Sequence, residues 1–395
     1  MLFKTLVAAV AVCGVALSAQ VNAADPVKIG FAGPLSGGSI DMGESMRNGA
    51  RLAVEEINNF KGGVLGRPIL LVERDDAAKA EVAVSVTKDL IQKEKVVAVI
   101  GFANTGPTLE TLPEFQAAKI PLIVAAATGA KITALYAGAD NYIFRVAVSD
   151  AIQPQLILND IIDKRNLGKI AIFHDASPYG TLGRDDVLKQ MEKRGIKPIL
   201  VESFKVGDKD MAAQVARAKA AGADAVLSYC LANEGAVLAN EMAKADFKVP
   251  LVGSWGLSQR NFLKGAGKNA NGVRMPQTFI AASNNFTRSA FLNAYYTRYS
   301  TTSIPSAVSA AQAYDAMMIL FTAINQAKSL EGPEIKKALE ALKRPVYGTI
   351  TTYQTPFSTT EHDAITLQIA LMGEIRGGEV TFAYKEDQVD RFRKK

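Results

Sequence analysis

Three turns in the first third of the chain place small, hydroxyl-bearing and glycine residues directly after predicted strands. They are residues 33–38, 101–106 and 125–129. In an open parallel sheet, ligands bind outside the carboxyl ends of the strands, where the turns lead into helix N-termini. The three turns therefore predict a pocket that offers backbone N–H and hydroxyl donors to a small molecule.

The sequence lacks the residues that catalysis at such a pocket would need. Its two histidines, His174 and His362, are too few for a typical multi-histidine metal site, and no Cys-x-x-Cys or Gly-x-Ser-x-Gly motif occurs. His174 and Asp175 are neighbours on a predicted strand, so their side chains point to opposite faces. Residues 265–270 fit a loose Gly-x-Gly-x-x-Ala pattern without the preceding strand that a dinucleotide loop requires. We predict a protein that is not an enzyme and holds no cofactor and no metal.

The N-terminus has the features of a secretory signal peptide. Lys4 supplies the positive charge, residues 6–17 are apolar, and Val21 and Ala23 are the small residues that precede a cleavage site. The apolar run is shorter than the roughly 20 residues of a membrane span. We therefore expect residues 1–23 to be removed and the mature chain to be exported.

Cysteine content and charge exclude two further classes of protein: disulfide-stabilised domains and nucleic-acid-binding proteins. Loss of Cys13 with the signal peptide leaves Cys230 alone, so the mature protein has no internal disulfide, and Cys230 is expected to be a small buried residue. The net charge of +6 has its one dense cluster at residues 391–395. Because no nucleic-acid motif or interleaved aromatic residues accompany this cluster, we interpret it as a solvated tail and expect no nucleic-acid partner.

Predicted strands alternate with predicted helices through the first two thirds of the chain. Ala50, Ala53, Val54 and Ile57 show the spacing of an amphipathic helix. The predicted strands are residues 27–32, 69–73, 96–100 and 122–125, followed by residues 169–174, 199–204, 225–229 and 250–253. Such alternation builds parallel sheets with right-handed crossovers. The pattern predicts an α/β protein with two doubly wound lobes.

The last third departs from this rhythm. The expected helices are residues 289–299, 306–327 and 334–342, and the expected strands are residues 348–352, 365–372 and 380–384. No flexible linker rich in glycine, serine or proline separates the two lobes. We therefore expect the chain to cross between them several times through ordered segments, which makes a hinge.

Several segments together resemble the periplasmic Leu/Ile/Val-binding protein family. In family order they are residues 27–37, 48–58, 62–66, 75–76, 99–101, 172–180 and 313–316. They cover essentially the whole mature chain. The resemblance implies a type I periplasmic binding protein, in which two lobes joined by three hinge crossovers enclose a ligand and deliver it to an ABC importer.

The resemblance also implies an organisation and partners. Lobe 1 would comprise residues 24–145 and 276–350, and lobe 2 residues 146–275 and 351–395. The protein would be a periplasmic monomer whose partners are a small-molecule carboxylate and the permease subunits in the inner membrane. The alternative is a ligand-sensing receptor-type domain of the same fold that signals and does not transport.

The family's ligand-binding residues correspond to specific positions of this chain. The resemblance assigns the ligand's carboxylate to Thr105 and Thr128, and its ammonium group to the carbonyl of Ala126, the Thr128 hydroxyl and an acidic residue of lobe 2. Ala127 lies in the same turn, and Tyr179 would close over the ligand from lobe 2.

Departures from the family pattern concern the same pocket. The acidic residue is replaced by Trp255. An enclosed cation without a counter-charge is costly, whereas an indole offers an apolar face for stacking. We therefore expect a carboxylate without an α-ammonium group, such as an aromatic or otherwise apolar acid. The alternative is that Trp255 belongs to the core or lid and another acid takes the role. Leu231 and Met42 replace tyrosines and make the pocket more apolar.

The family's disulfide cysteines correspond to Ala78 and Asn104, so that disulfide is absent. Asn104 then either caps the following helix or touches the ligand. Arg145, near the first predicted crossing, is expected to pair with backbone or with an acid such as Asp150.

Overall fold

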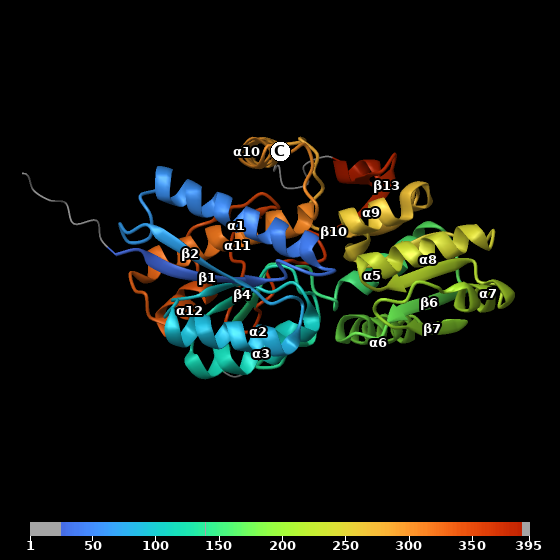
Figure 1. Ribbon diagram of the computed structural model, residues 1–395, viewed down its shortest axis with the longest axis horizontal. Helices are drawn as coiled ribbons and strands as arrows, with labels where there is room; N and C mark the ends of the chain where they lie inside the picture. Colours follow the sequence, from blue (N-terminus) through green and yellow to red (C-terminus); the bar gives the residue numbers. More distant parts are fainter. Residues whose placement is uncertain (1–24, 139, 389–395) are drawn as a thin grey trace, which may run out of the picture.

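The computed structural model describes residues 25–138 and 140–388. The predicted signal peptide and the basic cluster at residues 391–395 lie outside this part. Two groups of elements lie side by side, one mostly from the N-terminal strands and the C-terminal helices, the other from the middle of the chain (Figure 1). Each group is built around its own sheet.

The first sheet has five strands in the order β2–β1–β3–β4–β5, and all neighbours are parallel. They are β1 (Val27–Gly33), β2 (Ile69–Asp75), β3 (Val99–Gly101), β4 (Leu122–Val124) and β5 (Ile143–Arg145). The strand order reverses between β1 and β3, so the loops that leave these two strands diverge to opposite faces and open a crevice at their carboxyl ends.

Helices cover both faces of this sheet (Figure 1). On one face lie α1 (Ile40–Phe60), α10 (Phe286–Tyr299), α11 (Ala307–Ala327) and α12 (Gly332–Glu340). On the other lie α2 (Ala80–Lys88), which continues into a π-helical segment (Asp89–Lys93), together with α3 (Thr105–Ala118) and the short α4 (Lys131–Ala134). A two-stranded hairpin of β11 (Val346–Tyr347) and β12 (Thr352–Tyr353) follows α12.

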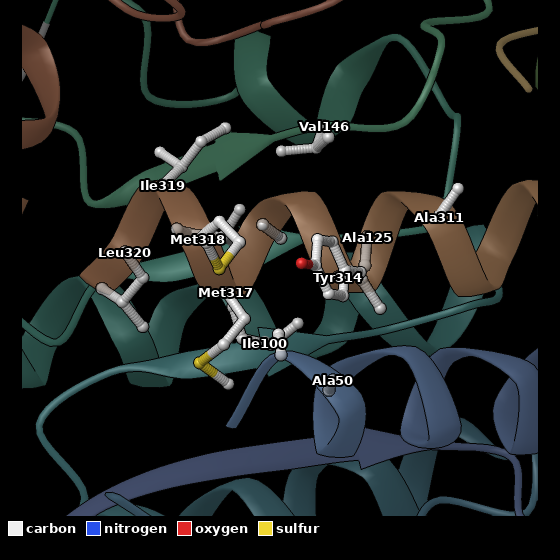
Figure 2. Close-up of a cluster of buried hydrophobic side chains, with 14 of the residues drawn as sticks. Ala50, Ile100, Ala125, Val146, Ala311, Tyr314, Met317, Met318, Ile319 and Leu320 are labelled. Atoms are coloured by element: carbon white, nitrogen blue, oxygen red, sulfur yellow. The ribbon is translucent and has the colours of Figure 1, made fainter. Parts of the chain in front are cut away.

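Helix α11 is the core of this lobe. Figure 2 shows its side chains packed among Ile100, Ala125 and Val146 of the sheet region and Ala50 of α1. A Cβ atom on Gly49 would lie 2.1 Å from the carbonyl oxygen of Ala310, so only glycine lets the two helix backbones approach this closely. The helix is long and apolar enough to cross a membrane, but 83% of its apolar window is buried inside the protein, as expected of a core helix.

The second sheet has seven strands in the order β14–β13–β10–β9–β8–β6–β7. The parallel strands are β6 (Ile170–Asp175), β7 (Leu200–Phe204), β8 (Ala225–Tyr229), β9 (Leu251–Gly253) and β10 (Arg274–Gln277). The antiparallel edge is formed by β13 (Leu371–Arg376) and β14 (Glu379–Phe382). The five parallel strands repeat the order of the first sheet, with the reversal between β6 and β8.

Helices also cover both faces of the second sheet. One face carries α5 (Gln153–Leu158), its π-helical continuation (Asn159–Lys164) and α6 (Pro178–Lys193). The other carries α7 (Ala212–Ala220), α8 (Ala232–Lys244) and α9 (Arg260–Ala266). Short 3₁₀ turns follow β9 (Trp255–Ser258), α9 (Gly267–Ala270) and β14 (Lys385–Gln388).

The prediction of two doubly wound lobes is confirmed, with errors at the short strands. The sequence patterns did not predict β5 or β10, which have three and four residues. Residues 348–352 were expected to form one strand, but they contain the turn between β11 and β12 and only the first residue of β12. Residues 365–370 were expected to begin a strand, but β13 begins at Leu371.

The chain passes between the two sheets after β5, after β10 and before β13. Residues 354–370, which precede the last crossing, pack on the first sheet. The rings of Phe357 and His362 lie 4.9 and 4.1 Å from that of Phe144. The division into lobes stays a proposal, and this packing moves its last boundary from residue 350 to about residue 370.

Arg145 ties the first and last crossings together. Its fully buried guanidinium donates to the carbonyl oxygens of Thr128 and Gly129 at 2.8 Å and makes two 2.7 Å bonds to the Asp363 carboxylate. The predicted pairing with backbone is confirmed. Its acidic partner is Asp363 and not Asp150, because Asp363 pairs with Arg145 as an isolated β-bridge at the end of β5.

We expect Arg145→Met to lower the free energy of unfolding by about 3–5 kcal/mol, because one partner of a buried ion pair would be left alone. Urea denaturation measures this loss. Arg298→Met is the matched control, since Arg298 pairs with Glu55 at an exposed site where an ion pair contributes about 0–1 kcal/mol. Equal effects of the two substitutions would contradict the structural role of Arg145.

Candidate functional site

A small cavity lies where the carboxyl ends of the two sheets face each other. Its lining residues follow strands of both sheets. They are Met42, Ala103, Asn104, Thr105, Thr128, Tyr179, Cys230, Leu231, Trp255, Gly256 and Gln259. The turns after β1 and β3 and the turns after β6 and β8 flank the two points of strand reversal, so the cavity occupies both crevices that the topology creates.

The first lobe presents a helix N-terminus to the cavity. Helix α3 begins at Thr105, directly after Asn104. The first N–H groups of a helix have no partner within it and attract anions. The Thr105 hydroxyl accepts a bond from the N–H of Gly129 at 3.3 Å, which joins the turns after β3 and β4. A Cβ atom on Gly129 would lie 2.4 Å from Thr105 Cγ2, so this contact requires glycine.

In the second lobe, Asp175, the last residue of β6, holds in place the turns that line the cavity. One carboxylate oxygen accepts from the N–H of Ser177 at 2.9 Å, and the other accepts from the N–H of Leu231 at 2.9 Å. Ser177 caps α6 by accepting from the N–H of Gly180. Asp175 thereby fixes the two turns that carry Tyr179 and Leu231. Sequence reasoning weighed Asp175 only as a catalytic residue, although an aspartate before Ser-Pro at a strand end is typical of such a turn.

The two lobes are in contact around the cavity. Asp41 at the start of α1 forms an ion pair with Arg260 and accepts from the N–H of Asn261 at 3.1 Å, both on α9. A Cβ atom on Gly106 would lie 3.1 Å from Cγ of Pro178, at the facing starts of α3 and α6. This arrangement is that of a closed cleft.

A larger outer chamber shares part of its wall with the cavity, including Met42, Thr105 and Gln259. Its remaining lining comes from turns of both lobes, so it forms the mouth of the cleft. A small molecule would reach the cavity through this mouth when the lobes separate.

Several buried polar atoms at the cavity make no hydrogen bond of normal geometry within residues 25–138 and 140–388, although Asp150 lies close to the Thr128 hydroxyl and Ser254 to the Tyr179 hydroxyl. They are Asn104 Oδ1, Thr128 Oγ1 and the Tyr179 hydroxyl. Buried polar atoms are nearly always paired in folded proteins, so each of these needs an explanation. The lining contains no acidic or basic side chain. The cavity therefore offers hydrogen bonds and apolar surface, without a charge of its own in contact with the guest.

Burial shifts the pKa values of titratable groups at and behind the lining toward their uncharged forms. Burial raises the pKa of Cys230, whose sulfur lies 3.0 Å from the Ser228 hydroxyl, so the thiol stays protonated. Burial, and then the nearby Asp150, raise the pKa of Tyr179. Burial also raises the pKa of Asp150 itself to about 7.

Six of the predicted ligand-binding residues line the cavity together: Asn104, Thr105, Thr128, Tyr179, Leu231 and Trp255. Ala126 and Ala127 do not line it. They are buried in the turn before Thr128, where their N–H groups donate to the carbonyl oxygen of Phe102. Which of these residues contact a ligand stays a prediction.

Asn104 does not cap α3 with its side chain. Its amide donates to the Ser39 hydroxyl at 3.1 Å, and its oxygen is left for another partner. Sequence reasoning missed Ala103 and Gly256, which adjoin predicted lining residues, and Gln259, which lies four residues after Trp255. It also did not place Cys230 at the cavity. Within the described residues, no group of three or more His, Cys, Asp or Glu side chains could hold a metal ion.

Comparison with known proteins adds to this geometry. Residues 26–378 match the family described as periplasmic binding protein. A Leu/Ile/Val-binding protein homologue of Brucella melitensis is 27% identical over 332 residues, which cover 83% of this chain and 88% of the relative.

Two solved structures resemble this one closely. A substrate-binding protein of a branched-chain amino acid transporter from Streptococcus pneumoniae, in complex with isoleucine, has a TM-score of 0.79 and 28% identity, covering 90% of this chain and 98% of its own. A solute-binding protein of an ABC transporter from Rhodopseudomonas palustris, in complex with benzoate, has a TM-score of 0.77 at 20% identity, covering 91% and 96%. At that identity the second likeness concerns the fold alone.

Proposed function

Because the chain belongs to the periplasmic binding protein family, we propose that it is the solute-binding protein of an ABC importer and encloses a small carboxylate between its lobes. The family consists of binding proteins, so the chain is not an enzyme. The observation that carries the proposal is the closed cavity at the two strand reversals. There the hydroxyls of Thr128 and Tyr179, which make no hydrogen bond of normal geometry among the described residues, lie beside the N-terminus of α3.

The polar wall of the cavity suits a carboxylate. The guest's oxygens would accept hydrogen bonds from the first N–H groups of α3 and from the hydroxyls of Thr105 and Thr128. Thr105 uses its oxygen to accept from Gly129, which leaves its hydrogen for a guest. Donors that are fixed in place before binding stabilise an anion without the reorganisation that water needs.

The apolar wall indicates the chemical class of the part of the guest that lies beyond its carboxylate. Trp255, Leu231 and Met42 provide indole and aliphatic surface, and no acidic side chain lines the cavity. An ammonium group would be enclosed there without a counter-charge, which is costly. A planar ring would stack on the indole with a gain of about 0.5–1.5 kcal/mol beyond its burial. We propose an aromatic or otherwise apolar acid without an α-ammonium group, in the manner of the benzoate-bound protein of the same fold.

A thermal-shift screen of aliphatic, aromatic and keto acids against amino acids and amides tests this proposal. We expect an acid without an ammonium group to raise the melting temperature, since a ligand that binds only the folded state stabilises it. Trp255→Glu should move the preference toward α-amino acids, whereas Trp255→Phe should not. An unchanged ligand spectrum in the glutamate variant would remove Trp255 from the site, and no stabilising carboxylate at all would refute the proposed class of solute.

Thr128→Ala should weaken binding of the best acid from that screen by about 1–3 kcal/mol, the range for losing a hydrogen bond to a charged group. Thr128→Ser keeps the hydroxyl and should retain most of the affinity. Isothermal titration calorimetry measures both. If the alanine variant bound as tightly as the unchanged protein, Thr128 would not contact the carboxylate.

A further inference from the structure

A buried carboxyl group lies directly behind the cavity. Asp150 belongs to the segment that follows β5, at the first crossing between the sheets, and has no exposed surface. Its Oδ1 atom accepts from the hydroxyl of Tyr229 at 2.5 Å and from the amide of Gln153 at 2.7 Å. Its Oδ2 atom has no hydrogen bond of normal geometry within the described residues.

Asp150 is connected to cavity residues of both lobes. Its N–H donates to the carbonyl oxygen of Thr128 at 2.8 Å. Gln153, which binds its carboxyl group, also accepts from the N–H of Trp255 at 3.0 Å. Tyr229, its other partner, packs against Tyr179 with ring centroids 5.3 Å apart. Three residues of the lining are thus linked to Asp150: Thr128 through its backbone carbonyl, Trp255 through Gln153, and Tyr179 through Tyr229.

The groups around Asp150 do not neutralise it. Arg145 favours its ionised form, but that guanidinium is already paired with Asp363. Asp186 on α6 opposes ionisation through its own charge, and Tyr179 and Tyr229 are uncharged phenols whose pKa values burial raises. Burial is the largest influence and raises the pKa of Asp150 to about 7. Both protonation states are therefore accessible near neutral pH.

The Thr128 hydroxyl lies between this carboxyl group and the cavity. It lies close enough to Asp150 to favour the carboxylate form, although its oxygen makes no hydrogen bond of normal geometry among the described residues. A hydroxyl has a single hydrogen to donate. If Asp150 is ionised, that hydrogen points to the carboxylate and the oxygen faces the cavity as an acceptor. If Asp150 is protonated, Asp150 donates to the oxygen and the hydrogen is free for a guest.

We propose that Asp150 determines the charge type of the bound solute by setting the direction of the Thr128 hydroxyl. This inference rests on the proposed function of the cavity. Protonated Asp150 makes Thr128 a donor to a carboxylate and places no negative charge behind it. Ionised Asp150 makes Thr128 an acceptor for a cationic group. Capture of a carboxylate without an ammonium group is therefore coupled to uptake of one proton from solvent by Asp150.

The coupling has a measurable size. If a carboxylate binds only when Asp150 is protonated, its affinity falls by about tenfold for each pH unit above the pKa of Asp150. With that pKa at about 7, binding should be about tenfold weaker at pH 8 than at pH 6.

Calorimetric titration of the unmodified protein tests this without any variant. Benzoate and L-isoleucine serve as probes, each in phosphate and in Tris buffer, which differ in ionisation enthalpy. We expect benzoate binding to take up close to one proton near pH 8 and to weaken about tenfold from pH 6 to pH 8. Benzoate binding with no proton uptake and a flat pH profile would overturn the role of Asp150 while leaving the proposed function intact.

Asp150→Asn is the specific variant, because an uncharged amide should bind benzoate with an affinity that no longer depends on pH. Asp186→Asn is the control and should keep the pH dependence. If L-isoleucine is the probe that binds, its affinity should rise from pH 6 to pH 8 in the unmodified protein and not in D150N. An isoleucine affinity with the same pH profile in both proteins would overturn the proposal.

Failure of both probes to bind would concern the proposed class of solute and not Asp150. For that case, a stability measurement without ligand tests Asp150. Because the folded-state pKa of Asp150 is raised above the ordinary value of 3.8, its ionisation disfavours the folded state progressively as pH rises from about 4 to about 7. The urea midpoint of D150N should therefore rise relative to the unmodified protein between pH 5 and pH 8. A constant difference would show that Asp150 is ionised throughout this range and would contradict the inference.

Discussion

The structure depends on one constraint: donors at the ends of two parallel sheets are buried against each other when the lobes close. Within the described residues, the hydroxyls of Thr128 and Tyr179 make no hydrogen bond of normal geometry, although Asp150 and Ser254 lie close to them. Leaving such a group unsatisfied costs about 1–3 kcal/mol. A guest that accepts their hydrogen bonds removes this cost only in the closed form. In the proposed function, ligand binding and lobe closure are therefore coupled.

The residues around the cavity hold its lining in position and take no part in chemistry. Arg145 fixes the carbonyl oxygens of Thr128 and Gly129, and Asp175 fixes the turns that carry Tyr179 and Leu231. Asp150 sits between these two sets at the first crossing and binds Tyr229 of the second lobe. The first crossing is therefore in contact with residues behind the cavity, and in the proposed mechanism a change in the charge of Asp150 affects the cavity without touching the guest.

Much of this architecture could be predicted from the sequence because its signals are local. Alternating apolar patterns marked the longer strands and helices, and glycine and hydroxyl residues after the strands marked the turns that line the cavity. The three-residue strand β5 has too little pattern to be recognised. Asp363 as the partner of Arg145, and Asp150 as the partner of Tyr229, depend on contacts 218 and 79 residues apart in the chain, which no local pattern reports.

Small-angle X-ray scattering tests the central claim most directly. The radius of gyration would be measured for the protein alone and with a saturating amount of the carboxylate that stabilises it most. We expect a smaller radius with the acid, because contacts to both lobes favour the closed form over the open form. An identical scattering curve with and without the bound acid would contradict enclosure of a guest by lobe closure.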